Sequence, residues 1–162
     1  YYNALLRTTC VATMLSAGHA ENALPQTAEA TINCRIIPGV EPSAVKAQLK
    51  KVIANPEIEI TSVWDTIWSS PSDLSLVMPD VEAVTTNMWP GVIVVPVMST
   101  GGTDGTFLRA EGIPTFGVSG IFTDVDDNRQ HGKDERIGVK QYFEAQEFMY
   151  RLVKKIAGPR LP

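Results

Sequence analysis

Histidine and cysteine are scarce in this sequence, which has two of each among its 162 residues. Zinc sites in proteins are built from three or four ligands, most often Cys and His side chains. The motifs HExxH, CxxC and GxSxG are absent, and so are the Walker and GxGxxG loops of nucleotide-binding proteins. These absences exclude the metal, redox, serine-hydrolase and nucleotide sites that such motifs form.

Long apolar runs and an excess of basic charge are also missing. No apolar run approaches the length of a membrane-spanning helix, and 14 basic against 18 acidic residues give a net charge of −4. We therefore expect neither a nucleic acid nor a membrane as partner. The opening YYNALLRTTC lacks the pattern of a signal peptide and is expected to be the middle of a domain. The compartment stays open between cytoplasm and periplasm.

The two cysteines, Cys10 and Cys34, each lie in a segment that predicts a strand. They could form a disulfide if the two strands are neighbours in one sheet. Isolated cysteines are, however, among the most frequently buried residues in proteins. The favoured interpretation is therefore a pair of buried free thiols.

The first part of the chain predicts an antiparallel sheet with one helix. Residues 7–15 are rich in Thr and Val, and residues 27–37 alternate between apolar and polar side chains, as in a strand with one buried face. A helix is expected to begin near Pro42, which suits the first helical turn, and residues 57–64 predict another strand. The order through Trp68 is therefore strand, strand, helix, strand, which is a ferredoxin-like arrangement of α+β type.

The second part of the chain predicts an α/β fold. Residues 81–88 are expected to be helical, and the apolar runs at 91–98 and 113–120 predict strands that are buried on both faces. A short helix is expected to end at Gly112, and a long final helix follows the acidic loop at residues 123–135. The apolar stripe of the final helix is Val139, Phe143, Met149, Leu152, Val153 and Ile156.

The sequence STGGTDG, residues 99–105, follows a predicted strand and opens a helix. Glycines allow a ligand to approach the backbone, and a helix start directs free N–H groups toward an anion. A carboxylate or a phosphate would suit such a loop, although no Lys follows it as in a Walker loop. The alternative is a glycine-rich turn in which Thr103 or Asp104 caps the helix.

Arg35 and Asn22 are candidates for binding a substrate. Arg35 lies on the polar face of the second predicted strand, and its guanidinium could hold a carboxylate with two parallel hydrogen bonds. The alternative is a solvated arginine, or one paired with an acid such as Glu29. Asn22 by itself is only a residue of the loop before Pro25.

The segment RQHGKDER, residues 129–136, contains His131, and five of its other seven residues are charged. A metal site needs at least three ligands, and the nearby acids show no recognisable ligand spacing. On local evidence the favoured interpretation of His131 is a residue of a solvated acidic surface loop, and a metal ligand or an acid–base residue are the alternatives. The same holds for His19.

Several of these motifs follow one another in a particular order: an N-x-x-P loop, a strand with Arg, GGTDG, GIP, and HG-x-x-E before a long helix. The segments are NALPQTAEATINCRIIPG, STGGTDGTFLRAEGIPTFGVSG and HGKDERIGVKQYFEAQEFMYRLV. This order resembles the M20 family of zinc metallopeptidases, with its carboxypeptidase G2-like, desuccinylase-like and aminoacylase-like members. The resemblance covers most of the chain, from about residue 7 to residue 156.

The resemblance implies a lid domain, commonly the dimer contact, inserted into an α/β catalytic domain. Residues 1–68 would be a partial lid and residues 69–162 the C-terminal part of the catalytic domain, with the boundary at residues 68–72. His131 would be the last metal ligand. The residues implied to contact substrate, in part across a dimer, are Asn22, Arg35, Gly101, Gly102 and Thr103. His19 matches no functional position of the family.

The implied function is zinc-dependent hydrolysis of an amide bond next to a free carboxylate. The whole enzyme would use two zinc ions, and substrates would be small peptides or N-acyl amino acids. The other metal ligands and the general base would lie upstream of Tyr1, so no catalytic residue is assigned in this chain, which is expected to be inactive alone and to require that missing half. The alternatives are a non-catalytic module for dimerisation or carboxylate binding, and a phosphate-binding loop at GGTDG.

Overall fold

The computed structural model describes residues 2–64, 67–124, 126–127 and 129–159. Its residues form two compact units, one from Tyr1–Pro71 with Val97–Thr115 and the other from Ser72–Pro96 with Phe116–Pro162. The division into a partial lid and a catalytic part near residue 68 stays a prediction. None of the described helices is long and apolar enough to cross a membrane.

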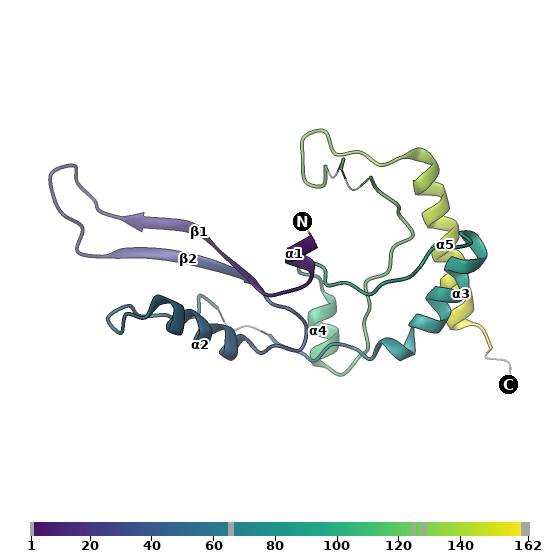
Figure 1. Cartoon of the computed structure of the whole chain (residues 1–162), viewed down its shortest axis with the longest axis horizontal. Coiled ribbons are helices and arrows are strands. Elements are labelled where there is room, and N and C mark those ends of the chain that lie inside the picture. Colours follow the sequence, from purple (N-terminus) through teal and green to yellow (C-terminus); the bar gives the residue numbers. More distant parts are fainter. Residues whose placement is uncertain (1, 65–66, 125, 128, 160–162) are drawn as a thin grey trace. The chain divides into compact units, whose positions relative to one another are not determined.

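An antiparallel hairpin is the main element of the first unit (Figure 1). It follows the short helix α1 (Tyr2–Leu5) and consists of β1 (Thr9–Ala17) and β2 (Ala28–Arg35). The two strands confirm the two that the sequence predicts for this region. The predicted burial of one face is wrong, because Ile32 and most other residues of both strands are exposed. Among the described helices and strands, none packs extensively on either face of the hairpin.

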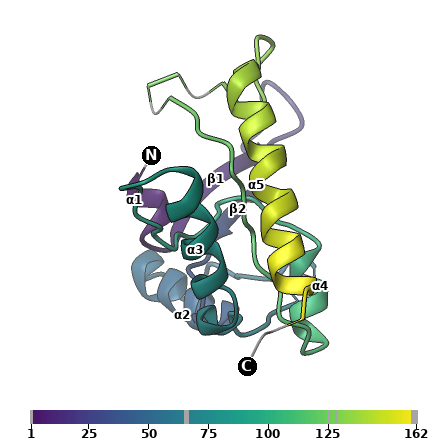
Figure 2. The same ribbon diagram turned by 90° about the vertical axis from the view of Figure 1, so that its right-hand side faces the viewer.

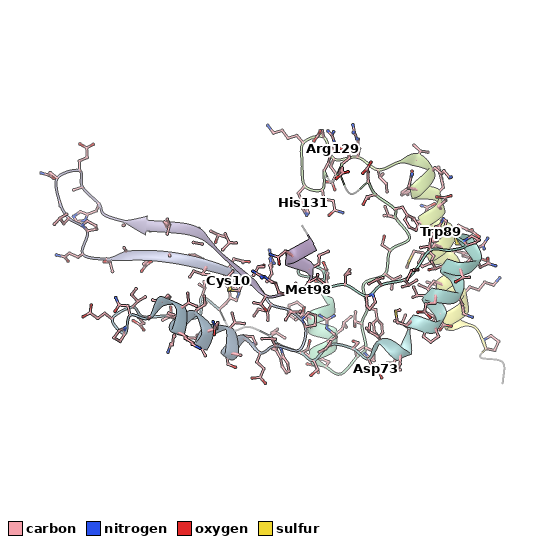
Figure 3. The ribbon with its side chains drawn as sticks, viewed as in Figure 1. Cys10, Asp73, Trp89, Met98, Arg129 and His131 are labelled. Carbon is pink, nitrogen blue, oxygen red and sulfur yellow. A yellow bond between two sulfur atoms is a disulfide. The ribbon has the colours of Figure 1, made fainter. Side chains whose placement is uncertain are left out.

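Cys10 and Cys34 form a disulfide across this hairpin (Figure 3). They are direct partners in the strand register, and their Cα atoms are 4.1 Å apart. The favoured interpretation as two buried free thiols is therefore wrong, since Cys10 is exposed and Cys34 only half-buried. Opposite residues of an antiparallel pair place their side chains on the same face, which brings two sulfur atoms within bonding reach.

The helix α2 (Pro42–Ile53) confirms the helix predicted after the hairpin, and Pro42 lies in its first turn. The strand predicted at residues 57–64 is wrong, since no described residue of that segment is in a strand. Instead, the Asn55 side chain accepts a hydrogen bond of 3.0 Å from the Glu57 N–H. In this local turn the Glu57 N–H is already hydrogen-bonded, so it cannot also bond to a neighbouring strand.

A short helix, α4 (Gly105–Ala110), follows the glycine-rich loop and confirms the helix predicted there. After α4 the chain reverses direction at Gly112, whose φ of 77° is unfavourable for a residue with a side chain. The Ile113 N–H donates a hydrogen bond of 2.9 Å to the Leu108 carbonyl across this reversal. The sequence therefore predicts this helix and its glycine stop correctly.

Two helices form the core of the second unit. The single turn η1 (Leu74–Leu76) leads into α3 (Met78–Met88), which lies alongside α5 (Val139–Ala157), as Figure 2 shows. The sequence predicts both helices. Their packed side chains are Val77, Val81, Val84, Phe148 and Leu152. Phe148 is 2% exposed and makes a ring contact with Trp89 at 5.5 Å between centroids.

The strands predicted at residues 91–98 and 113–120 are wrong, since all of these residues are described and none is in a strand. Val94 packs against the core of α3 and α5, whereas Ile93 is 83% exposed. A buried strand requires hydrogen-bonded neighbours on its edges, and none of the described residues provides them. The chain as described is α+β, with a two-stranded antiparallel sheet and several helices.

Candidate functional site

His131 lies in the loop that precedes α5, and its side chain is exposed. Its backbone is left-handed, with a φ of 65°. On either side of it, the Gly132 N–H donates to the Arg129 carbonyl at 3.0 Å and the Glu135 N–H to the Gly132 carbonyl at 3.3 Å. Figure 3 shows Arg129 and His131 on this loop. The turns present the imidazole on the outside of the loop.

Charged side chains on both sides of His131 are paired with one another. Arg129 forms ion pairs with Asp127 and Asp134, and Arg136 contacts the other oxygen of Asp127 at 2.6 Å. The hydrogen bond from Arg136, followed by that from Arg129, lowers the pKa of the Asp127 carboxyl below its usual value. Hydrogen bonds to Asp127 and Asp134 raise the pKa of Arg129. These four charged groups form one continuous row of ion pairs, from Arg136 to Asp134.

His131 can serve as a metal ligand only together with other polypeptide. Among the described residues, no three His, Cys, Asp or Glu side chains lie close enough together to hold a metal ion. Asp127 and Asp134 are already engaged by arginines. The His131 ring makes no hydrogen bond or ion pair with any described residue, so its nitrogens are free for coordination. The described residues therefore offer at most one zinc ligand here, and the role of His131 as that ligand stays a prediction.

The glycine-rich loop lines a shallow pocket of about 420 Å³ in the first unit. Three of its residues, Gly102, Thr103 and Asp104, lie in the wall. The large apolar side chains of Trp64, Ile67 and Phe107 lie beside them. Asp104 occupies the N-cap position of α4, but its side chain accepts no capping hydrogen bond. The loop therefore borders a pocket that has both polar backbone and aromatic surface.

Arg35 and Asn22 lie toward opposite ends of the hairpin. Arg35 ends β2 opposite Thr9, whereas Asn22 is in the loop that joins the strands. The eight residues of β2 extend over roughly 25 Å at about 3.3 Å per residue. Both side chains are exposed, and Arg35 makes no hydrogen bond or ion pair with a residue that the structure describes. One hairpin does not bring the two together.

The structure thus places each predicted site residue, without gathering all of them. Arg35, Asn22 and the glycine-rich loop belong to the first unit, and His131 belongs to the second. A common site of Arg35, His131 and the glycine-rich loop stays a prediction. Sequence reasoning missed Trp64, Ile67 and Phe107, because nothing local indicates that these apolar residues share a pocket.

The ion pairs of Arg129 and Arg136 in the His131 loop were not predicted from the sequence either. The local signal was present, since acids and bases alternate at short spacing between Asp124 and Arg136. Such a pattern permits ion pairs but does not indicate which acid each arginine contacts.

Comparison with known proteins relates this chain to a family. Residues 2–61 match the family model described as a peptidase dimerisation domain. The chain is 30% identical over 156 residues to a probable carboxypeptidase S-like 2 of Dictyostelium discoideum, covering 94% of this chain and 30% of the relative. It is 32% identical over 161 residues to the human N-fatty-acyl-amino acid synthase/hydrolase PM20D1, covering 94% of this chain and 31% of the relative.

The Xenopus tropicalis PM20D1 is 26% identical over 163 residues, which cover 99% of this chain and 32% of the relative. The chain therefore spans about a third of the length of the curated relatives it matches. No solved structure matches it. The dimerisation-domain match and the relatives agree with the order of motifs along the sequence, and both relate the chain to the M20 family.

Proposed function

We propose that this chain is part of an M20-type hydrolase that cleaves an amide bond next to a free carboxylate. The observation that carries the proposal is the similarity along 94% of the chain to a carboxypeptidase-like protein and an acyl-amino acid synthase/hydrolase. The substrates that these two names describe share one chemical feature, which is an amide nitrogen on an amino acid with a free carboxylate.

Arg35 is proposed to bind that carboxylate. Its guanidinium is exposed at the end of β2 and is engaged by none of the described residues. Arginine binds a carboxylate through two parallel, charge-assisted hydrogen bonds. Asn22 is proposed to contact polar groups near the scissile bond. Because it lies far from Arg35 within one hairpin, the two would meet at one substrate only across a dimer.

The pocket beside the glycine-rich loop is proposed to hold the rest of the substrate. Gly101, Gly102 and Thr103 would offer backbone N–H groups to polar atoms. The neighbouring Trp64, Ile67 and Phe107 would cover an apolar acyl or side-chain group. A pocket with a few polar groups and a mostly apolar wall is typical of small-molecule sites.

His131 is proposed to supply one ligand of a zinc centre with two ions. When bound, zinc supplies a Lewis acid and an activated water molecule. A single imidazole holds zinc weakly, so we propose that the other ligands and the general base come from polypeptide outside this chain. The chain alone would then be inactive. A homodimer through the hairpin is proposed from the dimerisation-domain match and from the outer edge of each strand, which pairs with no other strand among the described residues.

The test compares the chain alone with a polypeptide that also carries the residues encoded before Tyr1. With zinc and N-acyl amino acids or dipeptides, we expect turnover from the longer protein and none from the chain. His131→Ala should abolish that turnover, whereas the control His19→Ala should leave it unchanged. Equal turnover by the chain alone, or full activity of His131→Ala, would contradict the proposal.

A second candidate is a non-catalytic module for dimerisation or carboxylate binding. It is favoured by the absence of a three-ligand metal cluster among the described residues. Light scattering on the chain would then reveal a dimer, and the longer polypeptide would bind N-acyl amino acids without hydrolysing them.

A further inference from the structure

The backbone of His131 is unusual for its residue type. Of the described non-glycine residues, Ala54 and His131 have a positive φ, at 51° and 65°. Ala54 ends α2 as its C-cap, which is a common place for a left-handed residue. His131 lies at no helix end. A residue other than glycine keeps this left-handed backbone conformation only where the surrounding structure holds it, and such residues concentrate at functional sites.

Two kinds of contact hold the turn that contains His131. The Arg129 guanidinium reaches across His131 to the Asp134 carboxylate, and the Arg129 carbonyl accepts from the Gly132 N–H at 3.0 Å. The turn is also tightly packed at Gly132. A Cβ there would lie 3.1 Å from the Arg129 carbonyl oxygen and 3.2 Å from an Asp134 oxygen.

The position of Arg129 is itself fixed from the other side. Its Nε donates to Asp127, whose second oxygen is bound by Arg136 at 2.6 Å. Arg129 therefore uses two separate nitrogens to join an acid that precedes His131 to one that follows it. Lysine could not reproduce this, since its single ammonium lacks the planar fork of the guanidinium.

We propose that Arg129 is a positioning residue for His131, because its guanidinium joins Asp127 to Asp134 and thereby fixes the left-handed turn that presents the imidazole. The inference rests on the proposed function in one respect only, which is that the turn holds the His131 imidazole in position to bind zinc. The turn itself is a separate and directly measurable property of the full chain.

The first measurement is amide hydrogen exchange of Gly132, whose N–H is bonded inside the turn. Exposed ion pairs are weak, so Arg129→Gln should accelerate this exchange by about two- to fivefold. Asp134→Asn should also accelerate it, and the double variant should exchange no faster than Arg129→Gln alone, because Arg129→Gln already removes the interaction with Asp134. The control Lys140→Gln removes an exposed ion pair with Glu144 on α5 and should change nothing.

The second measurement follows the conformation of His131 by its amide–Hα coupling and its Cα and Cβ chemical shifts. These should move away from left-handed values in Arg129→Gln while the near-ultraviolet spectrum of the Trp89 core stays unchanged. Unchanged His131 signals, unchanged Gly132 exchange, or additive effects of the two substitutions would each overturn the proposal.

A zinc titration separates this inference from the proposed function. In the longer polypeptide that also carries the residues encoded before Tyr1, zinc should shift the ring signals of His131 at lower concentration than those of His19, because the proposed function places the other zinc ligands in that additional part. Arg129→Gln should reduce that difference. If the two histidines respond alike in that longer polypeptide, His131 is no preferred zinc ligand and the proposed function fails. The coupling and exchange results still decide whether Arg129 positions the turn.

Discussion

Cys10 lies directly opposite Cys34 in the hairpin, and their sulfur atoms are bonded. The bond closes a loop in which the two residues are 24 positions apart, and this loop contains the whole strand connection. A cross-link of this length limits the unfolded chain and fixes which residues of the two strands face each other. It therefore holds Arg35, the neighbour of Cys34, in its register at the end of β2.

The disulfide should stabilise the chain when it is produced under oxidising conditions. Chain-entropy arguments give about 3 kcal/mol for a loop of this length, so Cys10→Ser with Cys34→Ser should lower the free energy of unfolding by about that amount. Urea denaturation with and without reductant measures this difference. Ready alkylation of both thiols in the unreduced protein would show that the bond does not form.

Phe148 should be the most sensitive side chain of the helical core. It is 2% exposed between α3 and α5, and replacement of a buried Phe by Ala costs about 3–5 kcal/mol. Phe143 is a matched control on the same helix, since it is 62% exposed. Phe143→Ala should cost less than about 0.5 kcal/mol. Denaturation followed by the fluorescence of Trp89 compares the two, and equal losses would contradict this core.

Helices were the part of the fold that the sequence predicted well, because their patterns are local. The apolar residues of the final helix recur at helical spacing, and Pro42 marks the start of α2 without any tertiary contact. The predicted stripe of that helix is nevertheless wrong as its buried face, since only Leu152 of the six residues is buried, together with Ala145 and Phe148. Strands depend on a distant partner. The apolar run at residues 91–98 has the composition of a buried strand, but no described segment pairs with it. The strand prediction failed because the apolar composition of a segment does not show whether a second strand lies beside it.

The candidate site was predictable only as far as residue type reveals chemistry. Arg35 and His131 could be named as candidates for a carboxylate binder and a metal ligand from their side chains and from the order of the surrounding motifs, and both roles stay predictions. The disulfide depends on the hairpin register, and the left-handed backbone of His131 depends on ion pairs between residues on both sides of it. Neither relation follows from a pattern in the sequence.

The Asp127 carboxyl should titrate below its usual pKa of 3.8, because Arg136 and then Arg129 stabilise its charged form. A lowered pKa means that the ion pairs contribute stability above about pH 3.8, and that this contribution is lost as the pH falls through the lower folded-state value. Arg136→Gln should raise the Asp127 midpoint toward 3.8.

NMR titration of the carboxyl carbons measures that midpoint. Asp73 is the internal control, since its pKa is lowered by the N–H and hydroxyl of Ser75 and should not respond to the change at Arg136. An Asp127 midpoint that stays the same in Arg136→Gln would show that the ion pair at 2.6 Å does not persist in solution.

Phe107 should contribute to the binding of N-acyl amino acids that carry a long acyl chain. It lines the pocket beside Thr103, and loss of part of its apolar contact is worth about 1 kcal/mol, or roughly fivefold in affinity. Phe107→Ala should therefore weaken long-chain ligands more than the N-acetyl compound. Phe143→Ala again serves as the control, because Phe143 is exposed on α5 and does not line this pocket.

The most direct test of the account is calorimetric titration of the chain with an N-acyl amino acid and with its carboxamide analogue. If Arg35 binds the carboxylate, Arg35→Gln should weaken the acid at least about tenfold and leave the amide unaffected, and the exposed control Lys50→Gln should change neither. Equal affinity of native chain and Arg35→Gln for the acid, or equal binding of acid and amide by the native chain, would contradict the account.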